Sequence, residues 1–229
     1  MKFNFLTLFP EMFPSFLGHS LMGKALDKGL WSYETVNIRD FATDNYKSVD
    51  DTPFGGGAGM VMKPEVLDSA LKSVYTTGPL YYLSPRGRVF NQDTAKTWAT
   101  SETEMTFLCG RFEGIDERII DKWNIQEISI GDFVLSGGEP ALITMLDAMI
   151  RLLPSVMGNK ESAVEESFSD NLLEYPQYTK PQNWQGMSVP EVLLSGHHEN
   201  IRKWRLEQSK TLTKTRRPDL WTKYLANQQ

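Results

Sequence analysis

Two segments in which glycines alternate with acidic residues are the part of this chain best suited to chemistry. They run from Cys109 to Arg118 (CGRFEGIDER) and from Ser129 to Glu139 (SIGDFVLSGGE), and each follows an apolar run typical of a buried strand. Glycine lets backbone N–H and C=O groups approach a ligand closely. A third loop of this kind is expected at residues 84–87, after the apolar run 80–83. Because ligands of open α/β sheets bind beyond the carboxyl ends of the strands, the three loops predict a pocket for a small cofactor.

Strand-like and helix-like patterns alternate through the first 157 residues. Pro64 and Pro140 stand where the first turn of a helix tolerates proline. The alternation predicts an α/β fold in which a mostly parallel sheet carries helices on both faces. The expected strands are residues 2–9, 33–38, 80–83, 105–108 and 126–130, and the expected helices are residues 21–28, 64–74, 92–99, 116–123 and 140–153.

The remainder of the chain has a different pattern. Residues 158–169 are polar and acidic without sustained periodicity, which is typical of a linker. Beyond them no strand is expected, and helices are predicted at residues 190–194, at 200–214 and from Pro218 onward. We therefore predict three parts, which are an α/β cofactor-binding domain (residues 1–157), an interdomain linker (158–169) and a small α-helical C-terminal domain (170–229).

Composition is that of an ordinary globular protein and leaves the binding partner open. The chain has 229 residues, of which 40% are hydrophobic and 23% charged, and its net charge of −5 disfavours nucleic acid. From Gln177 onward, however, nine Lys and Arg residues stand against four Asp and Glu residues. This local excess is either an RNA-binding surface or a solvated basic face.

Cysteine usage and the apolar segments indicate the compartment. Cys109 is the only cysteine, which excludes an intrachain disulfide and suits a reducing cytoplasm. Its place at the end of an apolar run favours a buried structural thiol over a nucleophile. The apolar residues 1–9 are too few for a signal-peptide core, and no apolar stretch reaches membrane length. We expect a cytoplasmic protein without membrane contact.

A further glycine-rich segment, Gly55–Gly59, fits neither common nucleotide-binding pattern. A P-loop requires Lys-Ser or Lys-Thr after its last glycine, where this chain has Met60 and Val61, and the dinucleotide fingerprint requires a preceding strand. A loop that approaches a substrate and a purely structural turn both remain. His197 and His198 are adjacent and lack the spacing of metal ligands, so no metal site is predicted.

Taken together, these motifs resemble those of the bacterial tRNA (guanine-N1)-methyltransferases, a family of the SPOUT class. The resemblance covers nearly the whole chain, with matches at residues 50–60, 83–85, 167–168, 178–181, 189–196 and 216–220 besides the two segments above. It implies a deep trefoil knot in the sheet domain that holds S-adenosylmethionine. It also implies methylation of N1 of the guanosine at position 37 of tRNA, a homodimer with shared active sites, and loosely bound Mg²⁺ without assigned ligands.

S-Adenosylmethionine requires hydrogen bonds to its adenine edge, a platform for the ring and tolerance of the sulfonium charge. Backbone groups of Gly110 and of residues 130–135 suit the first two needs, and a carboxylate suits the third. Asp132 has an alternative role as a carboxylate that caps its loop. With the resemblance, the predicted cofactor-binding residues are Tyr82, Leu83, Ser84, Pro85, Gly110, Glu113, Ile130, Gly131, Asp132, Phe133, Val134, Leu135, Gly137 and Gly138.

Methylation of guanine N1 requires removal of its proton, which a positioned carboxylate can accept. A guanidinium can stabilise the negative charge that develops on O6. In the family an Asp directly before Ser-Phe and an Arg at the end of the long helix have these roles, and the matching residues here are Glu166 and Arg151. Glu165 and Asp170 are nearby alternatives to Glu166. The predicted substrate-binding residues are Asp50, Gly55, Gly57, Gly59 and Ser167.

Four departures from the family pattern are visible. Phe112 and Phe133 stand where the family commonly has Tyr, Arg86 replaces a frequent Gln, and Pro140 directly follows Glu139. None removes a backbone donor from the loops. Two other functions stay open, which are a related knotted methyltransferase acting on another RNA base or on ribose, and an RNA-binding regulator without catalysis.

Overall fold

The protein forms two compact units, Met1–Gly158 and Asn159–Gln229. The computed structural model describes residues 1–75, 77–157 and 166–228, and each unit is considered by itself. Of the predicted linker at residues 158–169, residues 158–165 lie outside the described part of the chain. The assignment of a linker and of a function to each domain therefore stays a prediction.

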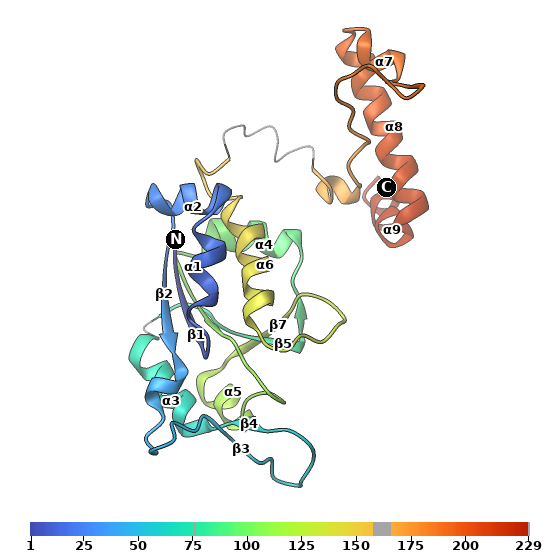
Figure 1. Ribbon diagram of the computed structural model, residues 1–229. Coiled ribbons are helices and arrows are strands. Elements are labelled where there is room, and N and C mark those ends of the chain that lie inside the picture. Colours follow the sequence, from blue (N-terminus) through green and yellow to red (C-terminus); the bar gives the residue numbers. More distant parts are fainter. Residues whose placement is uncertain (76, 158–165, 229) are drawn as a thin grey trace. The chain divides into compact units, whose positions relative to one another are not determined.

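A five-stranded sheet forms the centre of the first unit (Figure 1). Its strands are β1 (Lys2–Thr7), β2 (Ser32–Asn37), β5 (Leu80–Val89), β6 (Glu104–Leu108) and β7 (Gln126–Ser129). They lie in the order β2-β1-β6-β5-β7, and every neighbouring pair is parallel. The prediction of a mostly parallel α/β sheet is confirmed.

Two apolar cores, one on each face of the sheet, hold the helices. Helices α1 (Met12–Leu17), α2 (Ser20–Asp27), α4 (Gln92–Ser101) and α6 (Glu139–Ile150) pack on the face that carries Phe3, Phe5 and Phe107. Helices α3 (Pro64–Val74) and α5 (Glu117–Trp123) pack on the opposite face, against residues such as Leu6 and Leu108. Alternation of side chains along β1 explains this division, because successive residues of a strand point to opposite faces.

Strand β5 is longer than predicted and contains the third glycine loop within it. Its first part ends where Leu83 pairs with Ile128, and after an excursion Arg88 pairs with the same residue. Gly87 lies so close to the backbone of Ile128 that a Cβ would not fit. The prediction that the strand ends at Leu83 was wrong, because residues 84–87 bulge out of a strand that then resumes its pairing.

Four short elements of the first unit escaped the sequence patterns. Helix α1 begins at Met12, two residues after Pro10, and a 3₁₀ turn, η1 (Ile38–Phe41), follows β2. Strands β3 (Asp50–Asp51) and β4 (Val61–Met62) form an antiparallel ribbon that carries the glycine-rich segment 55–59 between them. Elements of two to six residues are too short for a periodic pattern to predict.

The second unit is mainly helical, as expected, but it also contains a hairpin. Its elements are η3 (Ser169–Asn171), β8 (Asn183–Trp184), β9 (Met187–Ser188), α7 (Glu191–Leu194), α8 (His198–Arg216) and α9 (Pro218–Ala226). The prediction of no strand there was wrong. Gln185 and Gly186 have φ values of 53° and 84°, which suit the two-residue turn of a tight hairpin.

Candidate functional site

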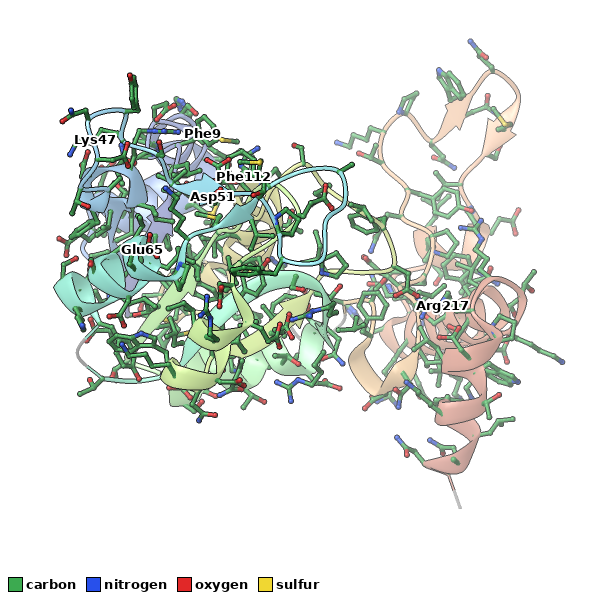
Figure 2. All side chains as sticks on the ribbon, turned by 90° about the horizontal axis from the view of Figure 1, so that it is seen from below. Phe9, Lys47, Asp51, Glu65, Phe112 and Arg217 are labelled. Atoms are coloured by element: carbon green, nitrogen blue, oxygen red, sulfur yellow. The ribbon has the colours of Figure 1, made fainter. Side chains whose placement is uncertain are left out.

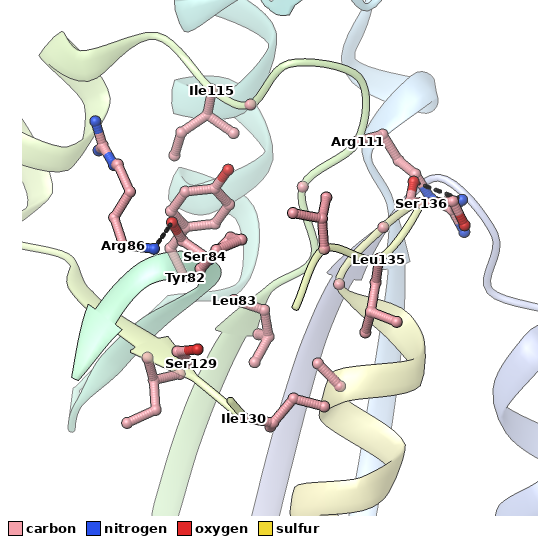
Figure 3. A pocket seen from close by; sticks show the side chains of 18 of the residues that line it. Tyr82, Leu83, Ser84, Arg86, Arg111, Ile115, Ser129, Ile130, Leu135 and Ser136 are labelled. Atoms are coloured by element: carbon pink, nitrogen blue, oxygen red, sulfur yellow. Dashed lines mark hydrogen bonds between the residues drawn. The ribbon is translucent and has the colours of Figure 1, made fainter. Parts of the chain in front are cut away.

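A cavity of about 350 Å³ opens at the bulge of β5 and beyond the carboxyl ends of β6 and β7, beside the beginning of α6 (Figure 3). This is the edge of the sheet at which ligands of parallel α/β folds bind. Its lining comes from three loops that are far apart in sequence. The residues are Tyr82–Arg86, Gly110–Ile115, Ile128–Gly131, Phe133–Gly138 and Ala141.

All residues that the sequence predicted to bind a cofactor line this cavity, except Asp132, which is an exposed residue beside it. The structure thus brings together three predicted loops at one place. Arg111 and Ser136 also line the cavity, although sequence reasoning assigned them no role. Their position between the motif glycines was the available signal. Cofactor binding by these residues stays a prediction.

Close approach of the backbone explains the glycines of the two motifs. A Cβ on Gly110 would lie 2.6 Å from the ring of Tyr82, and one on Gly138 would lie 2.9 Å from Cα of Cys109. The N–H of Gly138 donates a hydrogen bond to the carbonyl oxygen of Gly110 at 3.1 Å. The two motifs are therefore in direct contact, and any side chain at these positions would separate them.

On the side of the cavity formed by β5, Arg86 is paired with two glutamates. Nη2 of Arg86 lies 3.0 Å from Oε2 of Glu117 and 3.0 Å from Oε1 of Glu127, and these bonds raise the pKa of the guanidinium. The N–H of Arg86 donates to Oγ of Ser84 at 3.2 Å (Figure 3). Burial, followed by the charge of Glu127, raises the pKa of Tyr82 to about 12. The phenol of Tyr82 is therefore neutral at physiological pH.

The glycine-rich segment between β3 and β4 borders the cavity through Glu113. Gly59, at φ +88°, packs directly against the side chain of Glu113. The N–H of Glu113 donates to the carbonyl oxygen of Met60 at 3.0 Å, and the N–H of Met62 donates to that of Gly114 at 2.9 Å. Backbone hydrogen bonds thereby connect the loop predicted to contact the substrate to a loop predicted to contact the cofactor.

The other predicted substrate residues have unequal environments. Gly55 and Gly57 are exposed at φ values of +90° and +127°, a region that favours glycine. Asp50 lies on β3 and pairs with Met62. Ser167 belongs to the second unit, where its Oγ accepts a hydrogen bond from the N–H of Glu174 at 3.0 Å.

The predicted catalytic pair is divided between the two units of the chain. Arg151 is the C-terminal cap of α6 in the first unit, and Glu166 lies in the second unit. Both side chains are half-buried. Their joint action on a substrate stays a prediction.

Cys109 is fully buried, and burial, with the charge of Glu139, raises the pKa of its thiol. A buried thiol that resists ionisation is a poor nucleophile, which confirms the structural role predicted for this residue. Among the described residues, no group of three or more His, Cys, Asp or Glu side chains is arranged to hold a metal ion. Within the same residues, every helix is too short or too polar to cross a bilayer.

Fold and cavity define an α/β protein whose parallel sheet carries, at its carboxyl edge, a cavity lined mainly by loops. The sequence profile of the family described as tRNA (Guanine-1)-methyltransferase TrmD matches residues 1–223. The chain is 57% identical over 222 residues to a tRNA (guanine-N(1)-)-methyltransferase of Rhodospirillum rubrum, covering 96% of this chain and 92% of the relative. It is 56% identical over 231 residues to that of Bartonella henselae, covering 100% and 99%.

A third relative with the same description, from Ruegeria sp., is 53% identical over 229 residues, covering 98% of this chain and 93% of its own length. The chain belongs to the tRNA (guanine-1)-methyltransferase family, and it is a methyltransferase.

Proposed function

We propose that this protein transfers a methyl group from S-adenosylmethionine to N1 of the guanosine at position 37 of tRNA. The observation that carries the proposal is the cavity at the carboxyl edge of the sheet, which unites the predicted cofactor loops in a chain whose relatives are described as tRNA (guanine-N(1)-)-methyltransferases. A cavity of about 350 Å³ lies within the range of sites that bind small cofactors.

Backbone donors at the cavity support the choice of cofactor. Among the described residues, the N–H groups of Val134, Leu135 and Gly137 donate to no other protein group. They are thus available to the edge of an adenine ring. Leu83 and Ile115 supply apolar surface for the ring, and Glu113 supplies a carboxylate for the sulfonium charge. When bound, S-adenosylmethionine supplies an electrophilic methyl group.

The residues of this chain then act on the guanine. Glu166 accepts the proton of N1, so that the electron pair of the broken N–H bond forms the new bond from N1 to the methyl carbon. The bond between that carbon and sulfur breaks, and its electron pair stays on the sulfur of the departing S-adenosylhomocysteine. Arg151 stabilises the negative charge that develops on O6 as that proton leaves. A carboxylate in this position contributes roughly 10²–10⁴ in rate. Glu is one methylene longer than the Asp of the family, and its similar ordinary pKa preserves the chemistry.

The proposal includes a homodimer whose active sites contain residues of both subunits, and a trefoil knot in the first unit. Apolar side chains next to the cavity support the dimer. Phe112 and Val134 line the cavity and are 51% and 83% exposed. Phe9, whose ring centroid lies 4.5 Å from the guanidinium of Arg111 at the same cavity, is 37% exposed (Figure 2). Exposed apolar side chains that cluster in this way are typical of an interaction surface.

The second unit is assigned to tRNA binding, in agreement with its excess of basic residues from Gln177 onward. Substrate, cofactor and motifs together favour a cytoplasmic protein. Mg²⁺ is retained as an auxiliary ion only. Because the described residues form no cluster of three or more metal-ligating side chains, no step of the mechanism is assigned to it.

Incubation of the protein with methyl-labelled cofactor and tRNA that lacks the modification, followed by nucleoside analysis, tests the proposal. The expected product is 1-methylguanosine at position 37. Label in another base or in ribose would establish the related methyltransferase instead. RNA binding without label would establish the regulator that has no catalytic activity.

A further inference from the structure

A second cavity, entirely within the second unit, is built by two sequence motifs to which methyl transfer assigns no role. It measures about 450 Å³. One wall is the extended segment 175–182, which contains the motif Tyr178-Thr-Lys-Pro181. The facing wall combines Val189, Leu193 and Leu194 of the motif 189–196 with residues of α8. Two motifs of the family pattern therefore converge on one ligand-sized site.

Aromatic rings form part of the lining of this second cavity. Tyr178 and Trp204 line it with ring centroids 6.3 Å apart and an interplanar angle of 55°, so the tryptophan packs against the tyrosine in a tilted arrangement. Tyr178 nevertheless remains 49% exposed. The guanidinium of Arg205 lies 4.7 Å from the ring centroid of Tyr175 in the same wall. A ring that is held in place but half-exposed is suited to stack on a flat aromatic ligand.

Charge and hydrogen-bonding groups narrow the class of ligand. Lys180 and Arg205 line the cavity, and among its lining residues, all of which the structure describes, there is no Asp or Glu. Gln177 and Gln182 add amide groups. Nε2 of Gln177 donates to Oε1 of Glu174 at 2.7 Å, which leaves its amide oxygen to accept. Cations attract a phosphate backbone, and amides pair with the edges of bases.

We propose that this cavity binds an unpaired nucleobase of the substrate RNA, other than the methylated one, by stacking it on Tyr178. The inference rests on the proposed function for its ligand class, and it assigns to the second unit a base-specific contact in addition to general attraction. A proline-rich peptide also suits an aromatic groove. The positively charged lining favours RNA, which is a polyanion. Binding of a peptide is therefore an alternative outcome of the test.

Three variants of the full-length protein test the stacking contact. The probe is an unmodified tRNA transcript with S-adenosylhomocysteine at fixed ionic strength, and filter binding gives the Kd. Tyr178→Ala is expected to raise the Kd about 10-fold, and Tyr178→Phe to change it less than about 2-fold, because the ring carries the stacking. Trp184→Ala is the matched control, since Trp184 is 57% exposed in the same unit but does not line the cavity.

An unchanged Kd for Tyr178→Ala would overturn the proposal, and so would equal losses in Tyr178→Ala and Trp184→Ala, which would indicate a general RNA surface. Circular dichroism checks that each variant is folded. Binding of an oligoproline peptide that Tyr178→Ala abolishes, with RNA affinity unaffected, would establish the peptide instead.

Transcripts with 2-aminopurine at each unpaired position in turn identify the base. Quenching at one position by wild type and by Tyr178→Phe, but not by Tyr178→Ala, is the expected result, and quenching at no position would contradict it. Methylation by the wild type, measured on the same preparation, separates the two hypotheses. Tyr178-dependent RNA binding without methylation would refute only the proposed reaction, whereas methylation with Tyr178-independent RNA binding would refute only this site.

Discussion

Arg111 and Glu139 join the two glycine-rich motifs through a buried ion pair. Nη2 of Arg111 lies 2.9 Å from Oε2 of Glu139, whose side chain is fully buried. This oxygen has no aligned hydrogen bond among the described residues, so the contact is primarily electrostatic. The other carboxylate oxygen accepts a hydrogen bond from Oγ1 of Thr7 at 2.6 Å, and Nη1 of Arg111 donates to the carbonyl oxygen of Ser136 at 3.2 Å. The ion pair between Arg111 and Glu139 thus connects the two glycine-rich motifs to the end of β1.

Glu139→Gln replaces the carboxylate that pairs with Arg111 by a neutral amide, so the guanidinium beside the cavity loses its ion pair. Breaking a buried pair in this way costs about 3–5 kcal/mol, and the partial exposure of Arg111 reduces the expected loss in unfolding free energy to about 2–3 kcal/mol. Urea unfolding measures it, and calorimetry should show weaker cofactor binding. Glu34→Gln, which affects an exposed carboxylate 4.0 Å from Lys2, should leave both quantities unchanged. A Glu139→Gln protein as stable as wild type would show that the ion pair does not contribute to the free energy of unfolding.

Gly110→Ala is expected to weaken S-adenosylmethionine binding about 10-fold, because the added Cβ displaces the ring of Tyr82 at the cavity. Gly110→Trp should abolish binding in calorimetry while circular dichroism shows a folded protein. Gly186→Ala, in the hairpin of the second unit, meets no neighbouring atom but strains the backbone at φ +84°, so it is the control for a loss of stability away from the cavity. Unaltered affinity in a folded Gly110→Trp protein would place the cofactor elsewhere.

Glu166→Gln preserves the shape of the proposed base and removes its basicity. Turnover should fall roughly 10²-fold or more, with cofactor affinity unchanged. Glu166→Asp should retain activity. Arg151→Ala should also lower turnover, and the double variant should lose less than the sum, because both residues act on one transition state. If Glu165→Gln or Asp170→Asn is inactive while Glu166→Gln is normal, another carboxylate is the base.

Active sites shared between subunits predict complementation. A cofactor-site variant, Gly110→Trp, and a base variant, Glu166→Ala, are each expected to be inactive alone. After subunit exchange, the mixture should regain part of the wild-type turnover through hybrid dimers with one intact composite site. Exchange verified by mass spectrometry without any recovered activity would mean that each site is complete within one chain.

The ion pairs of Asp68 predict that part of the free energy of unfolding is lost at acidic pH. Its carboxylate lies 2.6 Å from Nζ of Lys122 and 2.7 Å from Nζ of Lys72, and these bonds lower its pKa strongly. A depressed pKa in the folded state stabilises the protein above the unfolded pKa of about 4, and this contribution is lost as the pH falls below that value. Asp68→Asn should cost about 1–2 kcal/mol at pH 7.

At pH 2–3 the difference between Asp68→Asn and wild type should be smaller. Thermal unfolding at both pH values measures it. Asp121→Asn, which alters a carboxylate on the same helix as Lys122, is the control. A constant difference between the proteins across this range would show that hydrogen bonds of the neutral group, and not the charge, account for the effect.

The sequence alone determined the α/β class, the position of most strands and the three loops that line the first cavity. These features follow from local patterns. Apolar runs predict buried strands, glycines mark the loops after them, and parallel strands place those loops at one edge of the sheet. Gly110 was found in this way, whereas Gly138 was assigned through the family resemblance, and the match to the family confirms the recognition on which both roles depend.

Only the tertiary structure decided which residues from distant segments meet. No local pattern pairs Thr7 with Glu139, brings Gly59 against Glu113, or places Tyr178 beside Trp204. The continuation of β5 after its bulge likewise depends on Ile128, about 40 residues further along the chain, with which both Leu83 and Arg88 pair. Contacts of this kind arise from packing and hydrogen bonding between elements, whose geometry is set by the whole fold and by no single stretch of sequence.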